Sequence, residues 1–204
     1  MRRCVAFSLL MIFVLPVAWA EPTLDDVISG IAARYGQAKT LKVDFEQVAV
    51  LKQLGNREKK SEGAIFFARP DKMRWSYTSE PAKEIITDGA SLVIHYVSEK
   101  KAYLSKSKGS FNVGLPMAIL SGKVDVKEQY TPEMLTEKDD LLRVKLVPKK
   151  PLGVSYLVLH VAKQGFLVKR VDTVDAYGNV TKIFLNNPRF NEKIPESTFT
   201  FVPK

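Results

Sequence analysis

The amino-acid sequence predicts a mainly β fold, in which a meandering antiparallel sheet closes on itself as a barrel. After one amphipathic helix, short segments of alternating polarity follow one another with turn residues between them, and about eleven strands are expected. Several of these segments are apolar on both faces, unlike the strands of a sheet with one wet face. No repeat, low-complexity tract or interdomain linker interrupts the pattern, so we expect a single domain.

The segment before this domain, residues 1–20, is expected to be a cleavable signal peptide. It begins with two arginines, continues with an apolar run from Val5 to Leu15, and ends on Ala18-Trp19-Ala20, the small-x-small pattern of a signal-peptidase site. The run is too short to cross a bilayer, which takes about 20 residues. Residues 21–204 are therefore expected to form the exported domain.

One helix is predicted at the start of this domain, over Leu24 to Tyr35. Thr23 can cap its N-terminus, two aspartates in the first turn suit the positive end of the helix dipole, and Gly36 is a plausible stop. Polar residues fill one side of the helix, which is therefore expected to lie on an apolar surface. Its apolar stripe consists of Leu24, Val27, Ile28, Ile31 and Tyr35.

The strands are placed by alternation and by the turn residues between them. Between Lys72 and Thr78, for example, Met73, Trp75 and Tyr77 point to one side of the strand. The predicted strands are Leu41–Leu51, Glu62–Ala68, Lys72–Thr78, Glu84–Thr87, Ser91–Val97, Lys101–Ser105, Val124–Gln129, Leu141–Pro148, Ser155–Val161, Leu167–Val174, Val180–Asn186 and a short last strand, Thr198–Val202.

One segment, Gly114 to Gly122, breaks the pattern of strands. Pro116 suits a first helical position and a glycine stands at each end, so a brief helical turn is predicted. Nearly every side chain in the turn is apolar. A helix of this kind must be buried or must cover an apolar opening.

The strands Ser91–Val97 and Ser155–Val161 are apolar on both faces. Two apolar faces need two covers, and the sequence offers little more than one helix. If the sheet closes into a barrel, one of its two faces lines the inside of the barrel. That interior is either an apolar cavity or a packed core, and the two would be encoded by nearly the same sequence.

The exported domain shows no arrangement of residues that supports catalysis. Cys4 lies in the signal peptide, so the domain has no thiolate, disulfide or cysteine-ligated metal. His95 and His160 stand alone in mid-strand, outside any zinc-binding pattern. The acidic pairs Asp25-Asp26 and Asp139-Asp140 are explained by helix capping and solvation. We expect no enzymatic activity, no cofactor and no metal site.

The net charge of +9 is a weak signal. A basic balance is often a sign of nucleic-acid binding, but export argues against that class of partner. The excess lysines are scattered in singles and pairs, which is typical of a solvated surface. The alternative is attraction to anionic phospholipid surfaces or to acidic patches on a partner.

Several motifs in one fixed order resemble the outer-membrane lipoprotein carrier family, LolA. The likeness covers essentially the whole exported domain, and the order of the pieces behind a signal peptide makes it specific. The motifs are Phe45-x-Gln47, Ser61-Glu62-Gly63, the run Ala68 to Tyr77 with its Arg69-Pro70, Pro81, Ile85 to Gly89, Leu115-Pro116 to Gly122, Asp175 with Gly178-Asn179, and Phe199-x-Phe201-x-Pro203.

The resemblance implies an incomplete antiparallel barrel with helices as a lid over a hydrophobic cavity. Members of the family are periplasmic chaperones that accept acylated lipoproteins from an inner-membrane lipoprotein-releasing ABC transporter. They pass this cargo to an outer-membrane lipoprotein receptor where one is present. By this likeness we expect a monomeric, non-enzymatic carrier in the periplasm that binds no nucleic acid. The alternative is a periplasmic protein of the same fold that senses lipids or lipoproteins, or carries another lipid.

The expected site combines strand parity with the resemblance. In the family, the arginine of the Arg-Pro motif lies near the lid and helps to hold the closed state, which makes Arg69 the expected gating residue. The other interpretation of Arg69 is a salt-bridged kink residue at the rim. A one-residue error in parity would move the whole set to the other face. The expected cavity residues are Phe45, Met73, Trp75, Tyr77, Leu92, Ile94 and Tyr96, and the expected lid residues are Ile28, Ile31, Tyr35, Met117 and Leu120.

Overall fold

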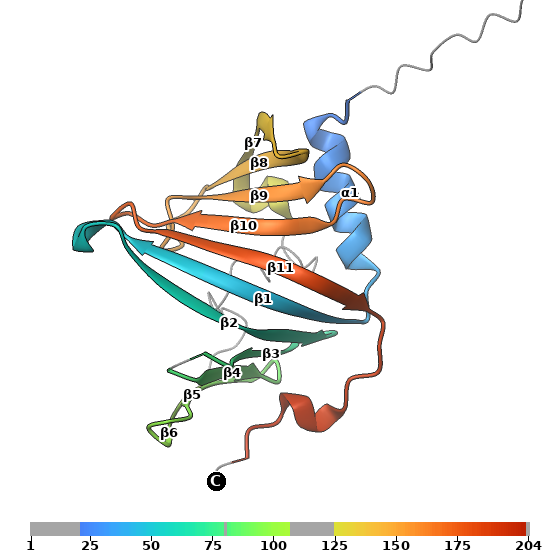
Figure 1. The fold of residues 1–204 in the computed structure, drawn as a ribbon. Helices are drawn as coiled ribbons and strands as arrows, with labels where there is room; N and C mark the ends of the chain where they lie inside the picture. The colour runs from blue at the N-terminus through green and yellow to red at the C-terminus, as the bar shows by residue number, and fades with distance from the viewer. Residues whose placement is uncertain (1–20, 80, 107–124, 203–204) are drawn as a thin grey trace, which may run out of the picture.

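The computed structural model describes residues 21–79, 81–106 and 125–202, and these form one open antiparallel sheet with few helices (Figure 1). The sheet has 11 strands in the order β6-β5-β4-β3-β2-β1-β11-β10-β9-β8-β7. Two meanders, β1–β6 and β7–β11, meet where β1 pairs with β11, and β6 and β7 form the two edges. The mainly β class and the incomplete antiparallel barrel of about eleven strands are thus confirmed.

The elements follow the predicted segments closely, although several strands are longer than predicted. In chain order they are α1 (Leu24–Gly36), β1 (Thr40–Leu51), the 3-10 turn η1 (Lys52–Leu54), β2 (Arg57–Ala68), β3 (Lys72–Tyr77), β4 (Lys83–Thr87), β5 (Ser91–Tyr96), β6 (Lys101–Lys106), α3 (Val126–Gln129), β7 (Tyr130–Lys138), β8 (Leu141–Pro148), β9 (Tyr156–Ala162), β10 (Val168–Val174), β11 (Val180–Phe190) and the 3-10 turn η2 (Glu196–Phe199).

Helix α1 begins as its sequence predicts. The Thr23 hydroxyl accepts a hydrogen bond from the Asp26 backbone N–H, and the Asp26 carboxylate accepts one from the Thr23 backbone N–H, which completes a capping box. Val27, Ile31 and Tyr35 are buried on one side of the helix. The helix stands across one end of strands β8–β11 (Figure 1).

Two predicted strands are wrong. Over 124–129 the described residues form the short helix α3, because the Asp125 carboxylate caps the backbone N–H groups of Lys127 and Glu128 at 2.9 and 3.1 Å. The seventh strand, β7, begins only after this turn. The predicted last strand, Thr198–Val202, is instead the end of η2 followed by irregular backbone that forms no ladder.

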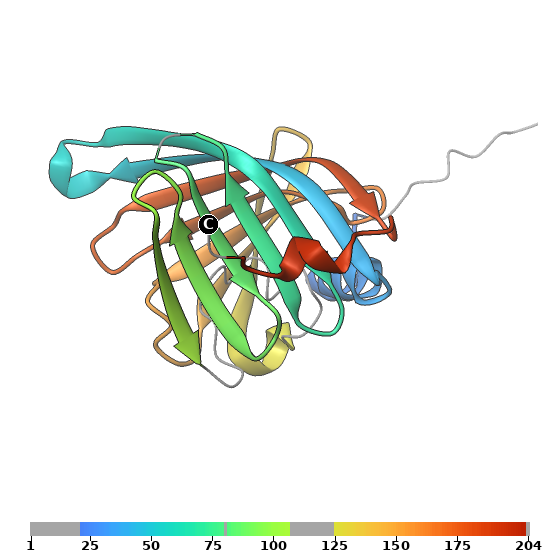
Figure 2. The same cartoon turned by 90° about the horizontal axis from the view of Figure 1, so that it is seen from below.

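The sheet is strongly curved (Figure 2), and its apolar core lies on one face, here named the concave face. This face carries Phe45, Trp75, Val144, Leu159 and Leu185, and the buried side chains of α1 join the same cluster. The apolar stripe of α1 therefore packs on the sheet, as predicted. The turn expected over 114–122 and the signal peptide expected over 1–20 lie outside the described residues.

The opposite, convex face of β3–β5 has its own cover. Residues 196–202, the C-terminal segment, cross this face (Figure 2). Arg74 donates to the carbonyl oxygen of Thr198 at 3.1 Å, and the rings of His95 and Phe201 lie 5.1 Å apart. Since Phe199 is buried as well, this segment explains why strand β5 is apolar on both faces.

The convex face of β9 buries a polar side chain, His160, as well as the apolar Val158. His160 is only 2% exposed, and its Nε2 lies 3.0 Å from Asp172 Oδ2 and 2.9 Å from Arg170 Nη2. His160 is thus a core residue, as its lone position in the middle of a strand predicts. Burial raises the pKa of Asp172, but its hydrogen bond with His160 and the charge of Arg170 outweigh burial and leave that pKa below 3.8.

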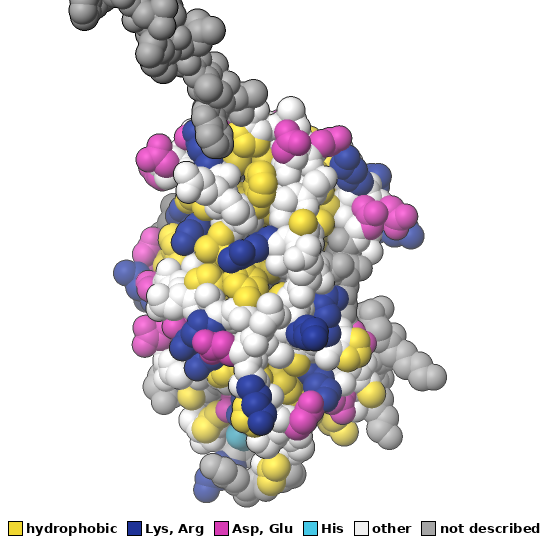
Figure 3. All heavy atoms as spheres, turned by 90° about the vertical axis from the view of Figure 1, so that its right-hand side faces the viewer, with side chains coloured by type: hydrophobic (Ala, Val, Ile, Leu, Met, Phe, Trp, Pro, Cys, Tyr) yellow, Lys and Arg dark blue, Asp and Glu magenta, His cyan; other side chains and the backbone are white. Residues whose placement is uncertain are grey.

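Charged side chains of both signs are interspersed around apolar ones on the side of the molecule where α1 lies (Figure 3). Several of them form ion pairs, such as Lys127 with Asp25 at 3.0 Å and Lys163 with Glu137 at 2.8 Å. This side is a mixed, solvated surface, as the scattered lysines suggest. Pairs of this exposure contribute little to stability.

Candidate acyl-chain binding face

The cross-strand register places all seven expected cavity residues on the concave face. Phe45 lies opposite Gly63, Gly63 opposite Tyr77, and the same row continues through β4 to Tyr96. Residues paired in this way have their side chains on one face of a sheet. The next rows are Trp75–Ile85–Ile94 and Met73–Thr87–Leu92.

Three aromatic rings form the centre of this face. Phe45 contacts Trp75 and Tyr77 edge-to-face, with ring centroids 5.3 and 5.0 Å apart, and the Trp75 and Tyr77 rings stack at 5.9 Å. The aromatic cluster of Phe45, Trp75 and Tyr77 thus provides a broad apolar floor with preferred ring geometry.

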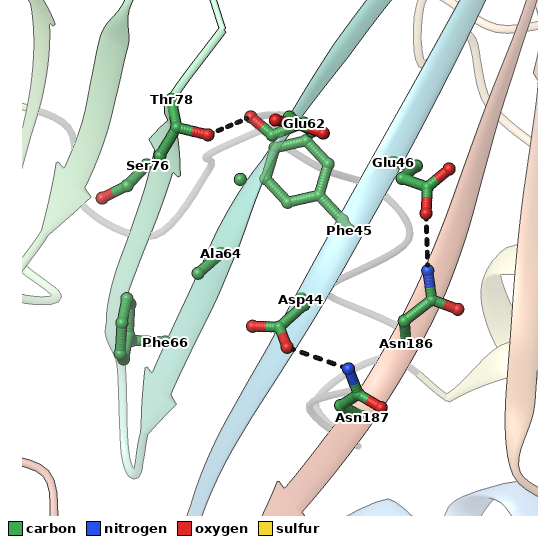
Figure 4. Close-up of a pocket in the computed structure, with 11 residues that line it drawn as sticks. Asp44, Phe45, Glu46, Glu62, Ala64, Phe66, Ser76, Thr78, Asn186 and Asn187 are labelled. Carbon is green, nitrogen blue, oxygen red and sulfur yellow. Dashed lines mark hydrogen bonds between the residues drawn. The ribbon is translucent and has the colours of Figure 1, made fainter.

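Gly63 makes this arrangement possible. A Cβ atom at this position would lie 1.9 Å from the backbone oxygen of Ser76 and 2.9 Å from Cε1 of Phe45. The Phe45 ring therefore reaches from β1 over the bare backbone of β2 (Figure 4). A glycine here is required by close approach.

Exposure divides the face into a covered part and an accessible part. Phe45, Met73, Trp75 and Leu92 are buried, whereas Tyr77, Ile94 and Tyr96 are only half-buried. The Tyr77 hydroxyl lies 3.1 Å from Gln47 Oε1, to which it donates, and burial raises the pKa of Tyr77 to about 12. The indole Nε1 of Trp75 is buried and has no hydrogen-bond partner among the described residues.

Helix α1 covers the other half of the concave face. Ile31 and Tyr35 are buried against the sheet, and Ile28 is half-buried. The Tyr35 hydroxyl accepts a hydrogen bond from the backbone N–H of Val168 at 3.1 Å, and its ring lies 5.6 Å from that of Phe190. The other two expected lid residues, Met117 and Leu120, lie outside the described residues.

Arg69 ties the end of α1 to the turn between β2 and β3. Its Nε donates to the carbonyl oxygen of Ala38 at 2.8 Å, and its Nη2 donates to those of Gly36 at 2.8 Å and Tyr35 at 3.2 Å. Tyr35 and Gly36 belong to the last turn of the helix, where the negative end of the dipole favours a cation, and Ala38 follows just after the helix ends. The guanidinium is thus a C-terminal cap supplied from the sheet.

A separate groove of about 530 Å³ lies on the convex face, over β1, β2 and β11 (Figure 4). Its lining is mixed, with the apolar Ala64 and Phe66 beside polar side chains such as Ser76. Within it, Asn187 donates to Asp44 at 3.3 Å and Asn186 donates to Glu46 at 3.2 Å. The carboxylates in this groove are Asp44, Glu46 and Glu62.

One residue of the concave face was missed at the level of sequence. Lys83 stands in the same row as Tyr77 and Tyr96, and its ammonium lies 4.3 Å from the centre of the Tyr77 ring. The predicted strand began one residue later, at Glu84. Side chains two positions apart in a strand point to the same face, so starting the strand at Lys83 would have placed Lys83 on the same face as Ile85.

Among the described residues, no group of His, Cys, Asp or Glu side chains is placed to hold a metal ion. In the same part of the chain, no helix is long and apolar enough to cross a membrane.

An open antiparallel sheet with an apolar concave face, partly covered by a helix, defines a carrier of hydrophobic ligands. Residues 36–202 match the family model described as outer membrane lipoprotein carrier protein LolA, and the chain belongs to this family. The resemblance inferred from the motifs is thus confirmed.

Individual relatives agree with this assignment. The chain is 29% identical over 197 residues to an outer-membrane lipoprotein carrier protein of Chromobacterium violaceum, covering 97% of this chain and 93% of the relative. It is 27% identical over 202 residues to a protein of the same name in Bordetella avium, with 98% and 95% covered. These relatives are named as carriers, so they do not favour the alternative of a sensor or a carrier of another lipid.

Solved structures share the fold at low sequence identity. An uncharacterized conserved protein from Thermus thermophilus matches with a TM-score of 0.57 at 8% identity, covering 88% of this chain and 94% of that one. A chain in the complex of MucA and MucB from Pseudomonas aeruginosa matches with a TM-score of 0.51 at 11% identity, covering 88% and 61%. Both show the fold alone.

Proposed function

We propose that this protein carries the acyl chains of lipoproteins on its concave face, from the inner membrane to the outer membrane, and catalyses no reaction. The observation that carries the proposal is the continuous apolar cluster that lines the concave face around the aromatic rings, in a chain of the lipoprotein carrier family. The proposed acyl site consists of Phe45, Met73, Trp75, Tyr77, Leu92, Ile94 and Tyr96.

Burial energetics explain why such cargo needs a carrier. Each methylene group that leaves water contributes about 0.8 kcal/mol, so an acyl chain of about 16 carbons costs on the order of 12 kcal/mol in water. A lipoprotein with two or three such chains would not cross an aqueous compartment unshielded at a useful rate. An apolar face of several strands offers the required burial.

Release requires that something compete with the cargo. In this proposal, α1 is part of the lid, and its buried residues Val27, Ile31 and Tyr35 would pack on the sheet when the carrier is empty. Closing the lid lowers the net affinity for acyl chains, because the cargo must displace contacts that the empty protein satisfies by itself. Arg69 holds α1 in the closed position through its three carbonyl contacts.

The Trp75 indole provides a hydrogen-bond donor within the apolar floor of the site. Its Nε1–H is buried without a partner among the described residues, and such a donor is costly to leave unpaired. An ester or amide carbonyl at the head of an acyl chain is an acceptor of the right kind. Bound lipid would satisfy this group and orient the chain on the floor.

The remaining parts of the proposal concern location and partners. Residues 1–20 are a cleavable signal peptide, and residues 21–204 act as a monomer in the periplasm. The cargo comes from an inner-membrane lipoprotein-releasing ABC transporter and goes to an outer-membrane receptor where one exists. Membership of the carrier family supports acylated lipoproteins as partners. Nucleic acid, metal and cofactor have no part in this function.

Native mass spectrometry of protein purified from the cell envelope tests the proposal. We expect a fraction of the protein to carry acylated cargo. Ile94→Glu, which puts a charge on the concave face, should abolish this loading while the protein stays folded. Leu104→Glu is the matched control, because Leu104 is 63% exposed and lies opposite the convex-facing Val93. Equal loading of the two variants, or no acylated cargo on the unaltered protein, would contradict the proposal.

A further inference from the structure

The carboxylates of strands β1–β6 all lie on one face of the sheet, whereas cations lie on both faces. The register assigns every carboxylate of these strands to the convex face: Asp44, Glu46, Glu58, Glu62 and Glu84. The charged residues that the same register assigns to the concave face are all cations: Arg57, Lys59, Lys83 and Lys101. The acyl-binding half of the sheet thus presents positive charge next to its apolar floor.

Lys83 is the innermost of these cations. It is half-buried, it lies over the Tyr77 ring, and no carboxylate of the described residues forms an ion pair with it. Burial lowers the pKa of Lys83, and the neighbouring charge of Lys59 lowers it further. Both lysines lie on the concave face, and no carboxylate of the described residues forms an ion pair with either of them. Lys101, at the rim, is paired with Glu99 at 3.3 Å.

The position of these lysines relative to the floor limits what they can bind. The row of Tyr77, Lys83 and Tyr96 follows the row of Trp75, Ile85 and Ile94, one same-face step along the strands. Such a step is about 7 Å. An acyl chain on the floor would thus have its polar end at the lysines.

We infer that Lys59 and Lys83 form a binding site for the phosphate of an anionic, acyl-bearing lipid whose chains lie on the Phe45–Trp75–Tyr77 floor. This inference rests on the proposed acyl-binding function and adds a second ligand class to it. Two cations that pair with no carboxylate in the described part of the chain favour a negatively charged group, and a phosphate diester joined to diacylglycerol places that charge directly beside the acyl chains. The ester linkage of the same lipid offers its carbonyl to the Trp75 Nε1–H.

Trp75 provides the readout. The sequence contains two tryptophans, Trp19 and Trp75, so in the full chain with Trp19→Phe the indole fluorescence reports the aromatic floor. The probes are dihexanoylphosphatidylglycerol, uncharged dihexanoylglycerol with the same chains, and glycerol 3-phosphate without chains. At low ionic strength we expect phosphatidylglycerol to bind about tenfold more tightly than dihexanoylglycerol, and added salt should reduce this advantage.

Charge-matched double variants complete the test. Lys59→Gln with Lys83→Gln should abolish the tenfold preference. Lys60→Gln with Lys182→Gln removes the same charge from the convex face, where both residues lie beside Val48, and should preserve it.

Three results would overturn the inference, and they differ in what else they affect. Equal binding of the two lipids, or an equal effect of the two double variants, refutes the phosphate site and leaves the acyl-binding function intact. Glycerol 3-phosphate that binds as tightly as the lipid makes free phosphate, not a lipid headgroup, the ligand. No response of Trp75 to either lipid refutes the acyl site as well.

Discussion

Replacing Arg69 by leucine should loosen α1 and leave the sheet intact. The guanidinium makes three charge-assisted hydrogen bonds, at 2.8, 2.8 and 3.2 Å, to carbonyl oxygens at the end of the helix. Water can reach these carbonyls once the helix end lifts, so each bond is taken as about 1 kcal/mol, the typical net value for a hydrogen bond and less than charged partners usually give. The closed position of α1 then loses about 3 kcal/mol, and its open population rises roughly 150-fold.

Amide hydrogen exchange measures this loss directly. In Arg69→Leu, the exchange-derived opening free energy of α1 should fall by about 3 kcal/mol, while strands β1 and β11 should keep their protection. The variant should also hold acyl cargo longer, because a weaker lid competes less well, and it should transfer lipoprotein to an acceptor membrane more slowly.

Arg74→Leu serves as the control for this experiment. Arg74 is half-buried, as Arg69 is, but it binds the C-terminal segment and Glu84 on the convex face. Its loss should lower overall stability without slowing transfer. Unchanged protection of α1 in Arg69→Leu, or delivery at the normal rate, would show that the carbonyl contacts do not hold the lid.

Three further predictions concern stability. Gly63→Ala should lower the free energy of unfolding in urea by about 1–3 kcal/mol, because the new Cβ would overlap the Ser76 carbonyl, whereas Gly36→Ala, with no atom within 4 Å of its Cβ, should not lower it. An unchanged midpoint for Gly63→Ala would refute the close-approach argument. Thr23→Ala should cost about 1 kcal/mol through loss of the capping box, seen as faster exchange in the first turn of α1. Because the pKa of Asp172 is held below 3.8, its contribution to stability is complete above that value and lost as the pH falls below it. Acid titration of Asp172→Asn should lack this part of the unfolding transition, and identical acid curves would contradict the assignment.

The helix and most of the strands were predictable because their signals are local. A capping residue, two aspartates and a stripe at helical spacing fix α1 within a few residues of chain. Alternation of period two places Met73, Trp75 and Tyr77 on one face whatever lies beside them. The prediction of a strand over 124–129 was wrong because Asp125 caps a helical turn, and a short polar segment carries too little periodicity to decide.

What the sequence determined by itself is the class of fold, most of the strands, the apolar face and the family. The tertiary structure decided which residues oppose one another: Gly63 beneath Phe45, Lys83 beside Tyr77, Arg69 at the end of α1 and the C-terminal segment over β3–β5. Parity and capping depend on neighbours within a turn or two of chain. Register and docking depend on pairings between distant segments, such as β1 with β11, and those pairings are set only when the whole sheet has formed.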